Sequence, residues 1–183
     1  EIGEAAFYGP KLDVNVKPAV GNEYTLSTCQ LDFCLPMRFD LKYVDKDGNK
    51  KTPVVLHRAI LGSLDRFMAY ILEETKGALP TWLSPVQVNV IPVNLEYHTE
   101  YSNKVYNLLI ENGIRAEVDL REEKLSYKMR ESQTRKIPFT LILGDNELNS
   151  DTVSYRCFGS KDTDTHATTD FINMIKERIA LKK

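Results

Sequence analysis

The alternation of strand-like and helix-like segments in residues 86–183 constrains the fold more than any other feature of this sequence. Four short apolar segments have the length and composition of buried strands, namely 86–91, 114–118, 139–143 and 153–158. Apolar residues recur at helical spacing in the segments around Val105, Met129 and Ile175. Strands that alternate with helices in this way predict an α/β layer with a largely parallel sheet.

Residues 1–78 show a different pattern, in which several short strands precede one helix. The alternation of apolar and polar residues predicts strands over 30–35, 42–44 and 53–56. Asp47-Gly48 lies between the last two of these strands and is typical of a hairpin turn. Apolar residues at helical spacing over 60–72 predict a helix, which Gly77 is well placed to end.

Two prolines, Pro80 and Pro85, mark the change between these patterns. We therefore expect residues 79–85 to form a linker between a domain of residues 1–78 and a domain of residues 86–183. Trp82 is expected to pack against one of the two domains, because an exposed indole would be costly.

Charge and composition exclude several classes of protein. The chain has 24 Lys and Arg against 26 Asp and Glu, so it lacks the excess positive charge of a protein that coats nucleic acid non-specifically. No apolar run approaches the roughly 20 residues of a membrane span, and no signal peptide is visible. Three cysteines without a CxxC pair favour a reducing, cytoplasmic location. Because the sequence lacks an initiator Met, we expect a fragment or a processed piece of a longer protein.

The strand-to-helix passage around Gly62 places Arg66 in the first turn of the predicted helix. A cation there opposes the helix dipole unless an anion lies nearby, so Arg66 is a candidate for holding a phosphate or stacking on a base. A surface arginine paired with Asp65 or Glu4 explains the same residues, and residue type alone favours that alternative. His57 taken alone is more typical of a packed histidine than of a metal ligand.

Two further segments carry candidate binding residues. In residues 7–11, the Gly-Pro turn brings Tyr8 close to Lys11, a pair suited to a carboxylate or phosphate, although an ordinary turn is the simpler interpretation. Residues 121–136 contain six Lys and Arg against three Glu, with Lys124, Lys128 and Arg135 on one helical stripe. Such a basic face suits a nucleic-acid backbone, and a solvated helix face fits equally well. Phosphate-loop, zinc-protease and serine-hydrolase motifs are absent from the sequence.

Several segments together carry a family resemblance. Four of them occur in the family's order and spacing, namely 7–11 (FYGPK), 28–33 (TCQLDF), 57–63 (HRAILGS) and 80–88 (PTWLSPVQV). The match continues through 119–121, Pro138 and 144–145, so it covers nearly the whole chain. The chain thus resembles threonyl-tRNA synthetases, which are class II aminoacyl-tRNA synthetases.

The resemblance implies an α+β protein in two parts. Residues 1–78 resemble the last part of the antiparallel class II catalytic domain, with the third signature motif on the helix that carries Arg66. Residues 86–183 resemble an α/β anticodon-binding domain with a mixed, largely parallel five-stranded sheet. The implied activity is the ATP- and Mg²⁺-dependent ligation of L-threonine to tRNA(Thr) through a threonyl-adenylate, in a cytoplasmic homodimer without membrane attachment. We expect this piece alone to be inactive but able to bind the anticodon.

The resemblance also assigns roles in the catalytic part. His57 is implied as one ligand of a Zn²⁺ that selects threonine over valine through its hydroxyl group. Arg66 is implied as the catalytic arginine, which packs on adenine and reaches the terminal phosphate of ATP. The remaining residues implied in threonine or ATP binding are Tyr8, Lys11, Thr28, Gln30 and Ser63. Asp65 stands where the family usually has Glu, and residues 25–27 differ from the usual run.

In the second part, Glu147 and Arg156 match positions that hydrogen-bond anticodon bases. Lys136 and Glu122 match two further anticodon-contacting positions, where the family often has Arg and Asn. Two alternatives stay open at this point. One is another class II synthetase, for prolyl, histidyl or glycyl transfer, and the other is a non-catalytic module that binds tRNA or another RNA.

Overall fold

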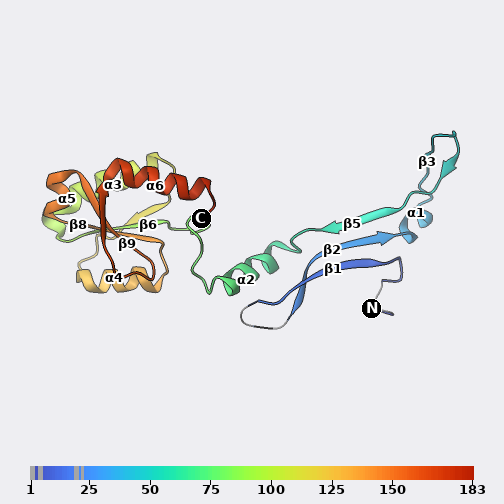
Figure 1. Cartoon of the computed structure of the whole chain (residues 1–183), viewed down its shortest axis with the longest axis horizontal. Helices are drawn as coiled ribbons and strands as arrows, with labels where there is room; N and C mark the ends of the chain where they lie inside the picture. The colour runs from blue at the N-terminus through green and yellow to red at the C-terminus, as the bar shows by residue number, and fades with distance from the viewer. Residues whose placement is uncertain (1–2, 4–5, 19–20, 22) are drawn as a thin grey trace. The chain divides into compact units, whose positions relative to one another are not determined.

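The computed structural model describes residues 3, 6–18, 21 and 23–183 of the chain. Glu4, a predicted partner of Arg66, lies outside the described residues. The chain divides into two compact units, Glu1–Thr75 and Lys76–Lys183, and each is described by itself (Figure 1). None of the helices in the described residues is long and apolar enough to span a bilayer.

The first unit is built on a three-stranded antiparallel sheet in the order β1-β2-β5. Its strands are β1 (Lys11–Val16), β2 (Tyr24–Asp32) and β5 (Val55–Ala59). The central strand pairs Gln30 with Lys11 on one side and with His57 on the other. Because residues directly opposite in a sheet point to the same face, these three side chains form one row across it.

Short elements complete the first unit. Helix α1 (Cys34–Arg38) follows β2, and helix α2 (Leu64–Glu74) follows β5 (Figure 1). The predicted strand over 30–35 ends at Asp32, because the Asp32 carboxylate accepts the N–H groups of Cys34 and Leu35 and starts α1. The turn at Asp47-Gly48 joins β3 (Tyr43–Val44) to β4 (Lys50–Lys51). The predicted hairpin partner, 53–56, was wrong, since it leads into β5.

The first unit lacks a hydrophobic interior in the part that the structure describes. Among the described residues from 6 to 75, no large hydrophobic side chain is buried. Several apolar side chains of the sheet, of α2 and of the turn before β1 are instead more than half exposed, namely Phe7, Leu12, Val14, Leu56, Leu64 and Met68. The two helices of this unit are too short to cover the apolar surface of its sheet. Such exposed apolar surface is typical of one part of a larger domain.

The second unit is a three-layer α/β structure. Its elements in chain order are β6 (Val88–Pro92), α3 (Leu95–Glu111), β7 (Ala116–Val118), α4 (Leu125–Thr134), β8 (Phe139–Leu143), α5 (Asp145–Ser150), β9 (Thr152–Cys157), β10 (Asp164–Ala167) and α6 (Thr168–Ala180). The five strands lie in the order β10-β9-β8-β6-β7. Strands β7, β6 and β8 are parallel, and β9 and β10 are antiparallel to their neighbours. The predicted mixed α/β fold is confirmed.

The core of the second unit lies between the sheet and the helices α3 and α6 (Figure 1). Val105 and Leu109 of α3 and Phe171 and Ile175 of α6 are all buried there. Helix α4 lies on the opposite face of the sheet (Figure 1). A buried hydrogen bond of 2.6 Å between the hydroxyl groups of Ser132 and Thr140 ties α4 to β8.

Residues 79–85 pack on the second unit. The Arg115 guanidinium donates hydrogen bonds to the carbonyl oxygens of Trp82 and Ser84, at 2.8 and 2.7 Å. The Gln87 amide donates to the carbonyl oxygen of Thr81 at 2.8 Å, and the Lys182 ammonium lies over the Trp82 ring. These contacts hold the segment between its two prolines against the residues that directly precede β6 and β7 and those that follow α6.

Candidate functional sites

One candidate site lies on the face of the first sheet that carries the Gln30 row. The Tyr8 hydroxyl donates to the Gln30 side-chain oxygen at 2.7 Å, and the Tyr8 ring lies 6.3 Å from the His57 ring. A cavity of about 370 Å³ opens beside these groups. It is lined by Phe7, Tyr8, Gln30, Asp32, Cys34, Leu35, Arg38 and His57. The structure therefore brings together three of the predicted site residues, Tyr8, Gln30 and His57.

Asp32 fixes the orientation of His57. Its side chain is only 2 % exposed, and its Oδ2 lies 2.9 Å from His57 Nε2. The Leu35 N–H, the His57 ring and the Cys34 N–H hold the pKa of Asp32 below its usual range, against the effect of burial. An ionised Asp32 directs Nε2–H of His57 toward itself, which leaves Nδ1 of the same ring as a free ligand atom.

The same face carries Lys11 and Thr28, which both contact Asp13. The Lys11 ammonium lies 2.6 Å from Asp13 Oδ2, and the Thr28 hydroxyl donates to Oδ1 at 2.7 Å. These bonds lower the pKa of Asp13, with Lys11 the larger cause. Neither Lys11 nor Thr28 lines the cavity beside His57.

Ser63 and Arg66 lie at the start of α2 and outside the lining of that cavity. The Ser63 hydroxyl caps the helix by accepting the N–H of Arg66 at 3.3 Å. The Arg66 guanidinium donates to the carbonyl oxygen of Thr25 at 3.3 Å. Since Asp65 forms no ion pair with Arg66 among the described residues, the guanidinium keeps most of its donors for another group.

His57 fits a metal ion as one ligand of a larger set. The described residues contain no group of three or more His, Cys, Asp or Glu that could hold a metal ion. An imidazole whose second nitrogen bonds a carboxylate has the usual arrangement of a zinc-binding histidine. The chain therefore provides one oriented nitrogen donor, and the other ligands of a zinc site would have to come from elsewhere.

A second candidate site lies in the second unit, on the sheet face that α4 covers. The Glu147 carboxylate accepts hydrogen bonds from the Ser154 hydroxyl at 2.5 Å and from the Gly144 N–H at 2.9 Å. Burial alone would raise the pKa of Glu147, but these bonds hold it below its usual range. Ser154 and Arg156 point to the same face of β9, because they are two residues apart.

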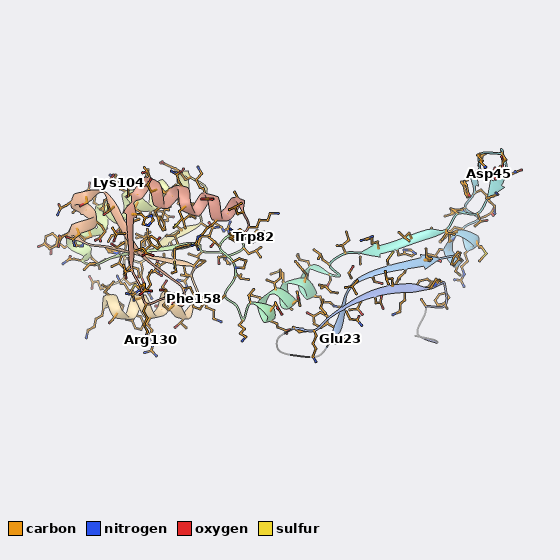
Figure 2. All side chains as sticks on the ribbon, viewed as in Figure 1. Glu23, Asp45, Trp82, Lys104, Arg130 and Phe158 are labelled. Atoms are coloured by element: carbon orange, nitrogen blue, oxygen red, sulfur yellow. The ribbon has the colours of Figure 1, made fainter. Side chains whose placement is uncertain are left out.

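Arg156 lines a cavity of about 460 Å³. The other lining residues are Leu125, Ser126, Met129, Arg130, Gln133 and Ile142. The guanidinium donates to the Thr163 hydroxyl at 3.2 Å, whereas its Nε is buried without a hydrogen-bond partner among the described residues. Figure 2 labels Arg130 on the outer side of α4.

Lys136 and Glu122 lie outside this cavity. The Lys136 ammonium donates to the carbonyl oxygen of Lys76, and its backbone has a φ of 56°. Lys136 lines a different cavity of about 160 Å³ with Gly77 and Pro85. Glu122 is exposed in the loop before α4. The structure therefore separates these two residues from the surface around Arg156.

The predicted basic stripe on residues 121–136 was wrong. Lys128 is buried and donates to the carbonyl oxygen of Asp119 at 3.0 Å. Arg135 forms an ion pair with Glu117, and Arg121 forms ion pairs with Asp119 and Glu131. Three of the six cations in this segment, Arg121, Lys128 and Arg135, therefore have a carboxylate of the same unit nearby.

Comparison with known proteins connects both sites to one enzyme family. The model for the tRNA synthetase class II core domain (G, H, P, S and T) matches residues 2–75, and the model for the anticodon binding domain matches residues 87–178. Threonine--tRNA ligase of Oceanobacillus iheyensis is 54% identical over 181 residues, which are 99% of this chain and 28% of the relative. The enzyme of the same name from Staphylococcus carnosus is 53% identical over 182 residues, 100% of this chain and 28% of the relative. The chain belongs to the threonyl-tRNA synthetase family.

Solved structures agree with this placement in the threonyl-tRNA synthetase family. The RNA binding domain of threonyl-tRNA synthetase from Cryptosporidium parvum Iowa II has a TM-score of 0.85 and 37% identity, and the match covers 96% of this chain and 44% of that one. Prolyl-tRNA synthetase from Cryptosporidium parvum has a TM-score of 0.72 at 18% identity, which shows a shared fold alone; the match covers 98% of this chain and 42% of that one. The chain spans about 28% of the length of the curated threonyl-tRNA synthetases that it matches.

Sequence reasoning missed two residues that the structure brings into the candidate sites. Asp32 holds His57, and Gln133 lines the cavity beside Arg156. Asp32 is two residues from Gln30 on the same strand, so its position on the shared face was available from the strand period. Gln133 gave no comparable signal, because its approach to Arg156 depends on how α4 lies on the sheet.

Proposed function

We propose that the intact protein ligates L-threonine to tRNA(Thr) through a threonyl-adenylate, with ATP and Mg²⁺ as the activating substrate. In this proposal, residues 1–78 form the C-terminal part of the catalytic domain. Residues 79–85 connect it to an anticodon-binding domain of residues 86–183. The observation that supports it best is the cavity at Tyr8, Gln30 and His57, where a buried carboxylate orients an imidazole beside a hydroxyl and an amide.

The cavity has the groups that a small polar amino acid requires. Tyr8 and Gln30 offer a hydroxyl and an amide for its polar atoms, and Phe7 and Leu35 provide an apolar wall for a methyl group. His57 would hold a zinc ion through the ring nitrogen that Asp32 leaves free. When bound, zinc supplies a Lewis-acidic centre that favours a side chain with a hydroxyl group over the isosteric methyl group of valine.

The second part of the catalytic proposal concerns ATP binding near the start of α2. We propose that Arg66 contacts adenine and the terminal phosphate of ATP, where its charge stabilises the transition state of adenylate formation. Thr28, Lys11 and Ser63 complete the binding surface. Lys11 is bonded to Asp13, so contact with a substrate carboxylate requires Lys11 to exchange partners.

The second unit provides tRNA recognition in this proposal. Arg156 and Glu147 approach unpaired anticodon bases from one face of the sheet, and Lys136 and Glu122 contact the loop nearby. Because three of the six cations of residues 121–136 are paired internally, base contacts rather than a broad basic surface would determine the specificity.

Amino-acid-dependent ATP–pyrophosphate exchange by the intact protein tests the catalytic proposal. Threonine should support exchange at least about 100-fold better than valine, because a site built to hold a hydroxyl rejects the analogue that lacks it. His57→Ala should abolish zinc binding and this preference. His166→Ala, a matched change at an exposed histidine of the second unit, should alter neither. Equal exchange with valine, or with proline, histidine or glycine, would refute the proposal.

Assays of the 183-residue chain alone test whether it binds the anticodon without catalysing adenylate formation. We expect negligible ATP–pyrophosphate exchange, because one oriented imidazole does not make a zinc site. We also expect the chain to bind the anticodon stem-loop of tRNA(Thr) in preference to loops of unrelated sequence. Equal affinity for all loops would contradict base recognition by residues 86–183. Elution of the intact protein as a dimer, checked by light scattering, would support the homodimer that the family implies.

A further inference from the structure

A groove of about 570 Å³ lies between helices α3 and α5 of the second unit and shares no lining residue with the two candidate sites. Leu148 and Asn149 of α5 and Asp151, which follows α5, line one part of it. Helix α3 contributes a stripe of side chains at steps of three and four residues, which therefore share one face of the helix. The stripe consists of Tyr97, Glu100, Tyr101 and Lys104. The volume is within the range of pockets that enclose a ligand or a large side chain.

Two contacts hold α3 against α5 and the strand that follows it. The buried His98 ring of α3 lies 3.1 Å from the Asp145 carboxylate at the start of α5. The Tyr101 hydroxyl of α3 donates to the carbonyl oxygen of Thr152 at 2.8 Å. Because these contacts fix both walls, the groove is already formed in the chain alone, which lowers the entropic cost of binding a partner.

The groove exposes two large side chains that a partner could cover. Tyr97 is 65% exposed and Leu148 is 41% exposed. The Asn94 side chain caps α3 by accepting the N–H of Tyr97 at 3.4 Å, which holds Tyr97 in the first turn of the helix. The groove therefore offers an aromatic ring and an aliphatic side chain together, and exposed aromatic residues in a groove are typical of protein-docking surfaces.

The charge on this groove is negative. The Glu100 carboxylate forms no ion pair or hydrogen bond among the described residues, and Glu96 lies one turn earlier on α3 with its carboxylate equally unpaired. The Lys104 ammonium is already paired with the Asp151 carboxylate at 2.9 Å. Unpaired carboxylates attract a cation and repel the phosphates of RNA. The groove therefore favours an occupant that is positively charged and also has an apolar part.

Arginine matches this combination better than lysine does. Its planar guanidinium donates two hydrogen bonds to one carboxylate and stacks on an aromatic ring, and its methylene groups pack on apolar surface. Tyr97 and Glu100 are three residues apart on one helix, so their Cβ atoms are neighbours at about 5–6 Å. One guanidinium can therefore contact both side chains, while its methylene groups cover Leu148.

We propose that the groove between α3 and α5 is a docking site for a basic segment of another protein, and that an arginine of this segment binds between Tyr97, Glu100 and Leu148. The amide of Asn149, which lines the same groove, is placed to bond the backbone of the segment. This inference goes beyond the proposed function and does not depend on it, because the groove uses none of the residues assigned to threonine, ATP or the anticodon.

Titration of the isotope-labelled 183-residue chain, followed by nuclear magnetic resonance, tests the site. The probes are the capped peptide Leu-Arg-Leu and its analogues with lysine or citrulline in place of arginine. Citrulline keeps the shape of arginine but carries no charge. The arginine peptide should bind about 3-fold more tightly than the lysine peptide and about 10-fold more tightly than the citrulline peptide. Its largest chemical-shift changes should be those of residues 97–104 and 148–151, which line the groove.

Two pairs of variants separate charge from stacking. Glu100→Gln should reduce the preference for arginine over citrulline to about 2-fold or less, because it removes the carboxylate that pairs with the guanidinium. Glu111→Gln makes the same change at an exposed glutamate of α3 outside the groove and should leave this preference unchanged. Tyr97→Leu should remove the preference for arginine over lysine, whereas Tyr127→Leu, at an exposed tyrosine of α4, should not. Circular dichroism and thermal melting confirm that each variant is folded.

Several results would overturn this inference. Equal binding of the arginine and citrulline peptides by the wild-type chain would refute the site, and so would a Glu100→Gln variant that discriminates as the wild type does. Shifts of the same residues that depend on the concentration of the chain alone would show that a second copy, rather than another protein, occupies the groove. Displacement of the arginine peptide by the anticodon stem-loop would assign the groove to RNA instead. A chain that prefers the arginine peptide as expected but binds no anticodon loop would refute anticodon binding alone.

Discussion

Replacement of Asp119 by Asn should destabilise the second unit, because it removes the counter-charge of a buried ammonium. The Asp119 carboxylate, 8% exposed, accepts bonds from the Arg121 guanidinium at 2.6 and 2.9 Å. It also lies 3.9 Å from the ammonium of Lys128, whose side chain is 2% exposed. Asn keeps the shape of Asp but carries no charge, so Lys128 would retain only its bond to the backbone carbonyl oxygen at position 119.

The size of the effect follows from this geometry. Breaking a fully buried ion pair costs about 3–5 kcal/mol, and half-exposed pairs such as that with Arg121 contribute about 1 kcal/mol or less. The ammonium of Lys128 lies as far as 3.9 Å from Asp119 and keeps its bond to the carbonyl oxygen. The cost of Asp119→Asn should therefore be less than that of breaking a fully buried ion pair. We expect a loss of about 2 kcal/mol in the free energy of unfolding at neutral pH, which lowers Tm by about 8 °C or more in a domain of this size.

The effect should depend on pH with a definite sign. Arg121 is the main cause that holds the pKa of Asp119 below its usual range. The carboxylate therefore stabilises the folded state above the pKa of about 4 in the unfolded chain, and this contribution is lost as pH falls through the lower folded pKa. The difference between wild type and Asp119→Asn should be largest near pH 7 and should shrink below about pH 4.

The fluorescence of Trp82 is a direct assay, since it is the single tryptophan of the chain and belongs to the second unit. Urea and thermal unfolding of the 183-residue chain would be followed at several pH values. Glu123→Gln removes one negative charge from an exposed side chain of the same segment and should change stability by less than about 0.5 kcal/mol. An Asp119→Asn variant as stable as this control, or a difference that stays constant down to pH 3, would refute the reasoning.

Three further substitutions test other contacts. Ser132→Ala leaves the buried hydroxyl of Thr140 without a partner and should cost about 1–3 kcal/mol in urea unfolding, whereas adding Thr140→Val should recover part of the loss. Arg115→Lys cannot reproduce the guanidinium bonds to two carbonyl oxygens of the 79–85 segment and should cost about 1–2 kcal/mol, with unchanged stability as the contrary result. In the intact protein, Asp32→Asn should weaken zinc binding about 10- to 100-fold in a chelator competition assay, because the neutral amide no longer holds the imidazole of His57; unchanged zinc affinity would contradict this role.

Hydrophobic periodicity was sufficient to predict the architecture of residues 86–183. The strands at 86–91 and 139–143 are almost wholly buried, so their composition is unambiguous. Strand β10 was not predicted, because Asp164–Ala167 is short and exposed and pairs only with β9. Strand β4 was missed for the same reason, since Lys50–Lys51 has no apolar residue that could indicate it.

The candidate sites were harder to predict than the fold. Strand register places His57 opposite Gln30, 27 positions away, and a side-chain hydrogen bond brings Tyr8, 22 positions away, to the same residue. Neither separation carries a local signal in the sequence. Charge counting misjudged residues 121–136, because it could not show that Lys128 turns inward to the carbonyl oxygen of Asp119. Contacts that depend on how helices pack on a sheet, such as that of Gln133, require the structure.

The uncovered apolar surface of the first unit limits what calorimetry of this chain can detect. Melting enthalpy and the accompanying heat-capacity increase arise largely from apolar groups that leave a packed interior. Residues 6–75 have no such interior in the part that the structure describes, whereas the second unit has a continuous one. A calorimetric scan should therefore show one cooperative peak that belongs to residues 76–183, and the strands around His57 should become calorimetrically visible only when the remainder of their own domain is present.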